Sequence, residues 1–195
     1  MARKTAEKRA DLRNRLIEIA DTWIAREGME NIKARPLAAE AGCAVGAIYN
    51  VFEDLDDLVM EVNSRTFKQL ASDVGEKGQD PNLDPAEALI RLALAYKQFA
   101  TDNHFKWQTL FDLRVERRND PPDWYMTELR QLFMYIAAPV SRQFPDLPPE
   151  DVELMTRALF SSVHGMVTLG LENRFSGVSP DKLEKMIRMI LTRIS

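Results

Sequence analysis

The sequence predicts an all-α fold of about nine helices, with three small helices at the N-terminus followed by a larger helical body. Apolar residues recur three and four positions apart along most of the 195-residue chain, which is the spacing of a buried helix face. Alternating strand patterns and Asn-Gly hairpin turns are absent from the sequence. Asp, Ser and Pro precede many of the apolar segments, and Gly follows several of them, as is typical of helix termini.

The first helix is expected from about residue 5 to 27, where Gly28 ends it. Two short helices are expected next, at about 34–41 and 45–51, with Gly42 in the tight turn between them. Two short helices joined in this way predict a helix-turn-helix. The first helix carries one apolar stripe, formed by Leu12, Leu16, Ile19, Ala20, Trp23 and Ile24.

Six further helices are expected in the rest of the chain. Asp54 is the expected N-cap of the first of them, and Asp84 that of the second. Pro139 is expected to kink the fourth, and residues 75–81 form the clearest linker. The expected ranges are 55–72, 85–100, 104–115, 121–144, 149–172 and 180–195.

Charge is unevenly distributed between the expected N-terminal domain, 1–54, and the expected body, 55–195. Residues 1–35 hold nine basic and six acidic side chains, a local net charge of +3, whereas the whole chain carries −4. The remaining 160 residues therefore carry −7. A basic head on an acidic body is typical of a protein that binds DNA with one part only. A solvated amphipathic helix is the alternative explanation of the same charges.

The composition, 45% hydrophobic and 29% charged, is that of an ordinary globular protein that can bury a core. No run of about 18 apolar residues exists, and the N-terminus leads straight into a charged stretch. We therefore expect neither a membrane span nor a signal peptide. Cys43 is the only cysteine, so no intrachain disulfide can form, and we expect a cytoplasmic location. His104 and His164 have no cysteine partners at ligand spacing, so no metal site and no cofactor is expected.

Enzyme motifs are missing from the sequence. It contains no Gly-x-Ser-x-Gly, no phosphate-binding glycine loop, no His-Glu-x-x-His and no catalytic cysteine context. The adjacent carboxylates Asp56 and Asp57 lie at a helix start, where the helix dipole explains them better than catalysis does. We therefore do not expect an enzyme.

The stretch from Ile17 to Leu58 resembles the DNA-binding domain of the tetracycline-repressor (TetR) family of transcriptional regulators. From Leu37 it reads LAAEAGCAVGAIYNVFEDLDDL. The matching positions are Ile17, Ala20, Gly28, Leu37, Ala38, Ala41, Gly42, Gly46, Ile48, Tyr49, Phe52 and Leu58. The resemblance implies a homodimer with the second short helix in the major groove of DNA and a small ligand held in the body. It also favours a repressor over an activator.

Eight residues are the candidates for DNA contact: Lys33, Arg35, Ala44, Val45, Gly46, Ala47, Tyr49 and Asn50. Within the second short helix only Asn50 can make a bidentate base contact. We therefore expect specificity from apolar contacts, from Lys33 or Arg35, and from DNA shape. Gly46 leaves room for a close approach to the DNA backbone. The resemblance implies that Tyr49 contacts a phosphate through its hydroxyl, with a core tyrosine as the alternative.

Three positions depart from the family pattern. Leu55 stands where the family usually has a phosphate-binding lysine, and the turn 53–57 is acidic. Each lost phosphate contact lowers the salt slope of binding by about one unit; the basic arm formed by Arg3, Lys4, Lys8 and Arg9 can offset the loss. Val51 stands where an aromatic residue is frequent. Cys43 replaces a valine, and is interpreted as a packing residue or as a redox sensor. A helical protein-interaction module with a degenerate DNA-binding head is therefore the alternative function.

The last two helices have the form of a dimer interface that would build a four-helix bundle with a second copy. The expected interface residues are Leu154, Leu159, Val163, Met166, Val167, Leu171, Leu183, Met186, Ile187, Ile190 and Leu191. Ordinary monomer core is the alternative. A two-fold dimer presents two recognition helices roughly 34 Å apart, so we expect a near-palindromic operator.

Aromatic and Met side chains in the middle of the chain are the candidates for ligand binding: Tyr96, Trp107, Phe111, Met126, Phe133, Phe160 and His164. Such a lining suits a largely apolar small molecule with a few polar anchors. Core packing is the alternative for each residue, and His164 is either an anchor or a hydrogen-bonded core histidine. Residues 160–165, FSSVHG, also resemble a Trp-x-x-x-His-Gly element of some TetR-family bodies. In the implied mechanism the ligand moves the helix from Leu55, so that ligand and DNA oppose each other by linkage.

Overall fold

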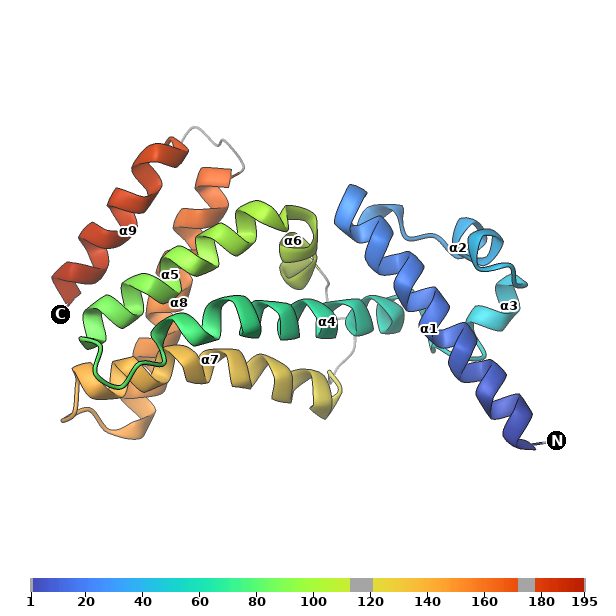
Figure 1. The fold of residues 1–195 in the computed structure, drawn as a ribbon, viewed down its shortest axis with the longest axis horizontal. Coiled ribbons are helices and arrows are strands. Elements are labelled where there is room, and N and C mark those ends of the chain that lie inside the picture. The colour runs from blue at the N-terminus through green and yellow to red at the C-terminus, as the bar shows by residue number, and fades with distance from the viewer. Residues whose placement is uncertain (1, 113–120, 172–177, 195) are drawn as a thin grey trace. The chain divides into compact units, whose positions relative to one another are not determined.

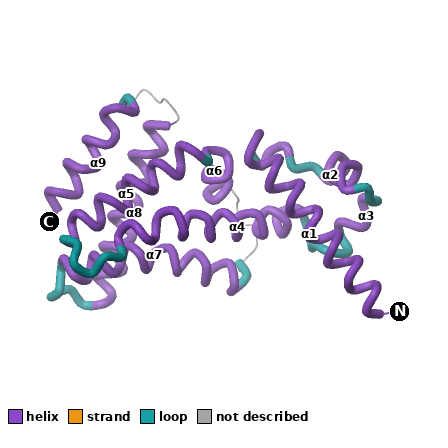
Figure 2. The backbone as a smooth tube through the Cα atoms, viewed as in Figure 1, coloured by secondary structure: helices purple, strands orange, loops and turns teal. Residues whose placement is uncertain are grey.

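The computed structural model describes residues 2–112, 121–171 and 178–194, and within these ranges the chain is helical with no strand (Figures 1 and 2). The all-α fold is confirmed, and each expected helix is present. The helices are α1 (Ala2–Glu27), α2 (Ala34–Ala41), α3 (Val45–Ile48), α4 (Leu55–Gly75), α5 (Pro85–Asp102), α6 (His104–Asp112), α7 (Asp123–Gln143), α8 (Pro149–Leu171) and α9 (Pro180–Ile194). None of the helices in the described ranges is long and apolar enough to cross a membrane.

The chain packs as two compact units, each built from two separate stretches of sequence. The head unit comprises Met1–Thr66 and Asn103–Tyr125, and the body unit comprises Phe67–Asp102 and Met126–Ser195. The head unit therefore contains α1, α2, α3 and α6, and both α4 and α7 supply residues to each unit. Each unit is described by itself below.

The core of the head unit forms around one face of α1. The apolar stripe expected from the sequence is buried at Leu16, Ala20 and Ile24, and it packs against α2 and α6. Lys106 of α6 forms an ion pair with Asp21 of α1 at 2.8 Å. These contacts hold α6 beside the helix-turn-helix within one unit.

The helix-turn-helix forms as predicted, with a left-handed glycine at its turn. Gly42 has φ of 65°, a conformation that costs other residues strain, and Cys43 N–H donates to Ala38 O at 2.9 Å. The Arg15 guanidinium donates to Ala41 O at 3.0 Å, which satisfies another carbonyl at the end of α2. The second helix, α3, ends at Ile48 and is shorter than expected, because the chain continues into a hydrogen-bonded turn there.

The N-terminus of α4 is capped as the sequence predicts. Asp54 Oδ1 accepts a hydrogen bond from Asp57 N–H at 2.8 Å, and Asp57 Oδ2 accepts one from Glu53 N–H at 3.1 Å. These reciprocal bonds satisfy backbone donors that a helix start otherwise leaves unpaired. Asp54 and Asp57 of the acidic turn therefore have a structural role in the helix start.

The core of the body unit lies among α5, α8 and α9, and Figure 1 shows α9 alongside α5. Gly170 of α8 permits close packing, since a Cβ there would lie 2.9 Å from Leu183 Cδ2. Six residues expected at a dimer interface are instead buried inside the single chain. They are Leu159, Val163, Val167, Leu183, Ile187 and Leu191. The expectation was wrong for these six because their apolar stripes cover each other and α5.

The expected linker at 75–81 is partly ordered as a 3₁₀ turn, Glu76–Gly78. Gly78 fits closely there, since a Cβ at this position would lie 2.7 Å from Leu92 Cγ of α5. The next helix begins as expected: Asp84 Oδ1 accepts from Ala86 N–H at 3.0 Å and Glu87 N–H at 3.2 Å. Pro139 lies inside α7 without ending it.

Candidate DNA-binding face and ligand cluster

The face of the helix-turn-helix around α3 is exposed at most of the predicted DNA-contact positions. Ile48 is fully buried and anchors α3, while Val45 is 37% exposed and Tyr49 is 50% exposed. The exposure of Tyr49 contradicts its alternative interpretation as a core residue. The remaining candidates on and beside α3 are Ala44, Gly46 and Asn50, which are exposed, and Ala47, which is half-buried.

No backbone conformation or packing contact described within the chain requires glycine at position 46. It lies in α3 with a negative φ, and a Cβ built there meets no atom within 4 Å. Gly42, by contrast, needs its left-handed backbone. Glycine in a helix is less favourable than alanine by about 0.5–1 kcal/mol. The open space at Gly46 is what a close approach by a molecule outside the chain would require.

The basic side chains of the head unit divide into two groups. Arg13 forms an ion pair with Glu61 and lies 5.3 Å above the Phe52 ring, and Arg15 caps α2. These two arginines hold the head unit together. A second group is exposed, with no side-chain hydrogen bond or ion pair to any described residue: Lys8, Arg9, Lys33 and Arg35. Counting charges along the sequence could not separate the two groups.

The start of α4 lacks the phosphate-binding lysine that is usual in the family, as the sequence indicated. Leu55 is half-buried, and no lysine or arginine occupies residues 53–57. Asp54 and Asp57 are engaged in the helix cap, which leaves Glu53 and Asp56 as the exposed acidic side chains. A phosphate contact from this turn would have to come from the backbone.

Four of the predicted ligand-binding residues meet in the body unit and form what we call the body-unit cluster: Tyr96, Phe133, Phe160 and His164. The Tyr96 hydroxyl lies 2.9 Å from His164 Nδ1. The Phe160 ring stacks on His164 at 5.5 Å and meets the Phe133 ring edge-on at 5.1 Å between centroids. The α8 residues stand one helical turn apart, so the same face of α8 presents both rings to α5 and α7.

The imidazole of His164 is half-buried, and burial lowers its pKa below the ordinary value of 6.5. Its Nδ1 shares a hydrogen bond with the Tyr96 hydroxyl, and its Nε2 lies 3.5 Å from Thr168 Oγ1, so each ring nitrogen faces a hydroxyl group. The cluster thus combines a neutral donor–acceptor pair with aromatic surface. Such a set can recognise an uncharged molecule with a flat apolar body.

The other predicted ligand residues do not belong to this cluster. Trp107 and Phe111 are part of the head unit, where their rings meet edge-on at 5.5 Å. Trp107 is buried, whereas Phe111 is exposed. Met126 is half-buried on α7. No group of three or more His, Cys, Asp or Glu side chains among the described residues is arranged to hold a metal ion.

Asn63 was missed by the sequence reasoning, although it is a fully buried polar residue of the head unit. Its Nδ2 donates to Thr109 O at 3.3 Å and to the Tyr125 hydroxyl at 3.2 Å, while its Oδ1 has no hydrogen-bond partner among the residues that the structure describes. A signal was present in the sequence. Asn63 lies four residues after Val59 and four before Phe67, within an apolar helical stripe.

Comparison with known protein families identifies the body. A family model described as the C-terminal domain of tetracyclin repressor-like proteins matches residues 89–194, which is more than half of the chain. Comparison with curated proteins gave no match.

Solved structures share the fold over nearly the whole chain. RolR, in complex with the ligand resorcinol, superposes with a TM-score of 0.69 at 21% identity, covering 97% of this chain and 89% of its own. A TetR-family transcriptional regulator from Bordetella parapertussis 12822 gives 0.65 at 16% identity, covering 92% and 93%. PfmR, a TetR-family regulator from Thermus thermophilus, gives 0.58 at 22% identity, covering 92% and 96%. The helix-turn-helix signature, the all-α fold and the matched body together show that the chain belongs to the tetracycline repressor-like family of transcriptional regulators.

Proposed function

We propose that the protein is a ligand-responsive regulator that binds a near-palindromic operator as a homodimer, and that a small, largely apolar molecule releases it from DNA. It would then act as a repressor. The observation that carries the proposal is the face around α3, where Ile48 is buried and Gly46 lies in open space. This face has the form of a surface shaped to meet another molecule.

The proposed DNA contacts divide by chemistry. The methyl groups of the exposed Ala44 and Val45 and of the half-buried Ala47 can contact thymine methyls, and Asn50 can bind adenine in the major groove. The Tyr49 hydroxyl is proposed to donate to a phosphate. Lys33 and Arg35 supply exposed positive charge at the start of α2. Residues 1–54 form the DNA-binding domain in this proposal and 55–195 form the ligand-binding and dimerisation domain.

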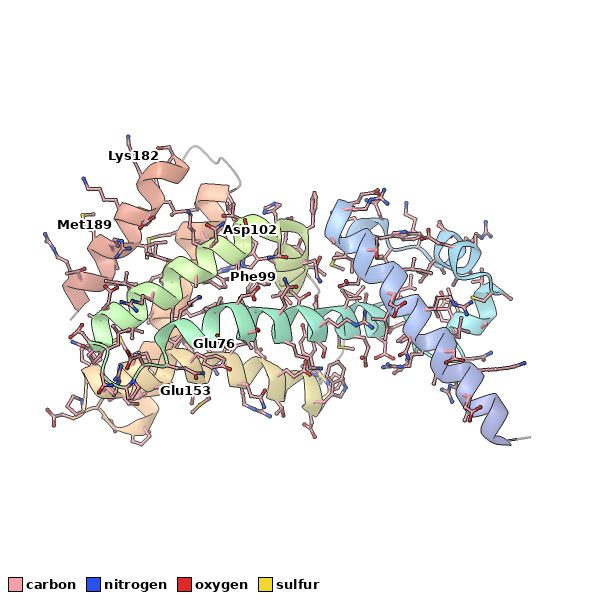
Figure 3. All side chains as sticks on the ribbon, viewed as in Figure 1. Glu76, Phe99, Asp102, Glu153, Lys182 and Met189 are labelled. Atoms are coloured by element: carbon pink, nitrogen blue, oxygen red, sulfur yellow. The ribbon has the colours of Figure 1, made fainter. Side chains whose placement is uncertain are left out.

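The proposed dimer uses the outer faces of α8 and α9. Leu154 and Leu169 of α8 and Met189 of α9 are exposed although they are apolar, and Met189 is 54% exposed (Figure 3). Gly165 lies on α8 where an added Cβ would meet no atom within 4 Å. Small and apolar residues on an outer helix face allow two helices to approach closely, and a second copy of the chain would cover them.

The body-unit cluster is the proposed effector site. Tyr96 and His164 offer a hydrogen-bonding pair, and Phe133 and Phe160 offer ring surface. Resorcinol, the ligand of RolR, has this combination of hydroxyls and a flat ring, so simple phenols are reasonable first compounds to screen. The effector and DNA would oppose each other because each binds a different conformation of the dimer.

The testing experiment is selection of bound duplexes from a random DNA library, followed by titration of the enriched duplex at two salt concentrations. We expect an inverted repeat with half-sites about one helical turn apart and a steep fall of affinity with salt. Arg35→Ala should lower the salt slope by about one unit. Absence of enrichment would contradict the proposal.

A helical protein-interaction module is the second candidate function. The observation that favours it is the start of α4, where Leu55 and the exposed carboxylates of Glu53 and Asp56 present no cation to a phosphate. Under this alternative the selection would enrich no sequence, and any DNA binding would be weak and independent of the α3 residues.

A further inference from the structure

The first turns of α1 extend beyond the other helices of the head unit (Figure 1). Every residue from 6 to 11 is exposed, and the first buried side chain described in α1 is that of Leu16. Most helices in proteins are stabilised by packing on one face more than by the propensity of their residues. The exposed α1 segment, residues 6–11, instead offers all of its faces to another molecule.

Two arginines attach the next turns of α1 to the rest of the head unit. Arg15 donates to Ala41 O at the end of α2, just before the turn of the helix-turn-helix. Arg13 forms an ion pair with Glu61 of α4 and lies over the Phe52 ring. These contacts fix the direction in which the exposed α1 segment extends from the helix-turn-helix.

Helical spacing aligns the two cations of the exposed α1 segment with these arginines. Arg9 stands four residues before Arg13, and Lys8 stands seven residues before Arg15. Residues four or seven apart share a helix face, so each cation lies on the face of the arginine that follows it. Neither Lys8 nor Arg9 forms a side-chain hydrogen bond or ion pair with a described residue. Both positive charges are therefore available to a partner outside the chain.

The acidic residues of the exposed α1 segment occupy a different face. Glu7 and Asp11 stand four residues apart, and both lie about 160° around the helix from Arg9 at 3.6 residues per turn. The face of α1 that carries Arg9 therefore presents positive charge without a carboxylate beside it on the same helix.

The length of the segment sets how far these charges reach. Seven residues separate Lys8 from Arg15, which is about 10 Å of helix at a rise of about 1.5 Å per residue. This length corresponds to roughly three base-pair steps of DNA at about 3.4 Å each. Cations at that distance from the helix-turn-helix are placed to meet DNA outside the base pairs that α3 would contact.

We propose that Lys8 and Arg9 bind the phosphate backbone of the DNA that flanks each half-site, and that this contact replaces the phosphate contact missing at the start of α4. The inference rests on the proposed function, since it adds a second DNA-binding surface to a DNA-binding regulator. DNA is the favoured partner because the head unit presents two more exposed cations, Lys33 and Arg35, on the helix-turn-helix. Phosphate is favoured over base edges because neither cation is held in the fixed orientation that a bidentate base contact requires.

The test uses two duplexes that both contain the enriched inverted repeat. One ends at the outer edges of the repeat, and the other continues on each side for about one helical turn of arbitrary sequence. Fluorescence anisotropy over a range of salt concentrations gives the affinity and the salt slope for each duplex. The unmodified protein should bind the flanked duplex about tenfold more tightly, with a salt slope steeper by about two to four units, because each phosphate contact contributes about 0.9 and two copies present four cations.

Two double variants separate a contact by these residues from an effect of DNA length or of net charge. Lys8→Gln combined with Arg9→Gln should bind the two duplexes with nearly equal affinity. Arg26→Gln combined with Lys182→Gln is the matched control, because it removes the same charge from exposed positions at the other end of α1 and on α9. The control should keep the full preference for the flanked duplex, and both variants should unfold at the temperature of the unmodified protein.

Three results would overturn the inference. A preference for the flanked duplex that survives in the Lys8→Gln and Arg9→Gln variant would assign it to DNA length, and an equal loss in the control would assign it to net charge. Equal binding of both duplexes by the unmodified protein would leave an acidic surface of another protein as the partner of the exposed α1 segment.

A third duplex, which lacks the repeat, distinguishes this inference from the function on which it rests. If a repeat is enriched and its flanks have no effect, the α1 contact is wrong and the regulator remains. If no sequence is enriched, the third duplex still tests the contact through its salt-dependent binding. Weaker binding of that duplex by the Lys8→Gln and Arg9→Gln variant, but not by the control, would retain the α1 contact without the operator. Equal binding by the two variants would reject the α1 contact as well.

Discussion

The helix-turn-helix and the α8–α9 pair differ in how completely their sequences specify them. Around α3, Gly42 predicted a tight turn and Gly46 predicted room for a close approach, and the structure has both the turn and the space. Along α8 and α9, apolar periodicity predicted an interface, and the most buried of those residues are the chain's own core. A glycine with a left-handed backbone specifies the local geometry of the chain. An apolar stripe predicts that a helix face is buried, but it does not identify the partner that buries it.

The largest change in stability should come from a substitution on the buried face of α9, compared with one on its exposed face. Ile187→Ala removes fully buried side-chain volume and should lower the free energy of unfolding by about 2–5 kcal/mol. Met189→Ala, two residues along on the exposed side, should change the free energy of unfolding of the monomer by less than about 0.5 kcal/mol, provided that the measurement is made at a protein concentration that keeps the chain monomeric. Chemical denaturation at one fixed protein concentration measures both. Comparable losses would mean that α9 is covered on both faces within the folded state.

The oligomeric state completes this comparison. Met189→Glu puts a charge on the exposed face, so sedimentation should show more monomer than for the unmodified protein. Lys182→Glu, also exposed on α9 near its start, is the control for added negative charge. A dimer that is indifferent to Met189→Glu would place the interface on another surface.

Gly46→Ala tests the open surface of α3. Because a Cβ there meets nothing in the chain, the variant should be as stable as the unmodified protein or more stable by up to about 1 kcal/mol. Affinity for the enriched duplex should nevertheless fall about tenfold, or about 1.4 kcal/mol. Fluorescence anisotropy and thermal unfolding on the same sample give both values. Unchanged affinity would remove Gly46 from the DNA interface.

Substitutions of Arg35 and Arg13 compare an exposed arginine with an arginine that stabilises the fold. Arg35→Ala should weaken DNA binding and lower the salt slope by about one unit, with little change in stability. Arg13→Ala breaks the ion pair with Glu61 and the contact over Phe52, so it should lower stability by up to about 1 kcal/mol and leave the salt slope unchanged. The reverse pattern would show that the division of the basic side chains is wrong.

The smallest effect should come from the protonation of His164. Its folded-state pKa lies below the ordinary 6.5, so the unfolded chain binds the proton more readily. Stability should therefore fall as the pH drops below about 6.5 towards the folded-state pKa. His164→Gln should remove that part of the pH dependence, as measured by unfolding at pH values above the range where carboxylates titrate. The same slope in both proteins would assign the dependence to other groups.

The sequence predicted the helices better than the contacts between them. The bounds of α2, the caps at Asp54 and Asp84, and the ends at Gly28 and Gly42 are local features, and local chemistry sufficed to find them. The pairing of Tyr96 with His164, 68 residues apart, depends on how α5 meets α8, which no local pattern contains. Asn63 was missed for the same reason, because its partners at Thr109 and Tyr125 come from distant segments.

The division into two discontinuous units has a spectroscopic consequence. All three tryptophans, Trp23, Trp107 and Trp124, belong to the head unit, and the body unit contains none. Indole emission therefore follows the head unit alone, while far-ultraviolet circular dichroism follows helices in both. Unfolding curves that coincide by the two signals would show one cooperative transition. A circular dichroism change that precedes the indole change would show that the body unit can unfold while the head unit stays folded. Tryptophan fluorescence therefore reports on the head unit without any added label.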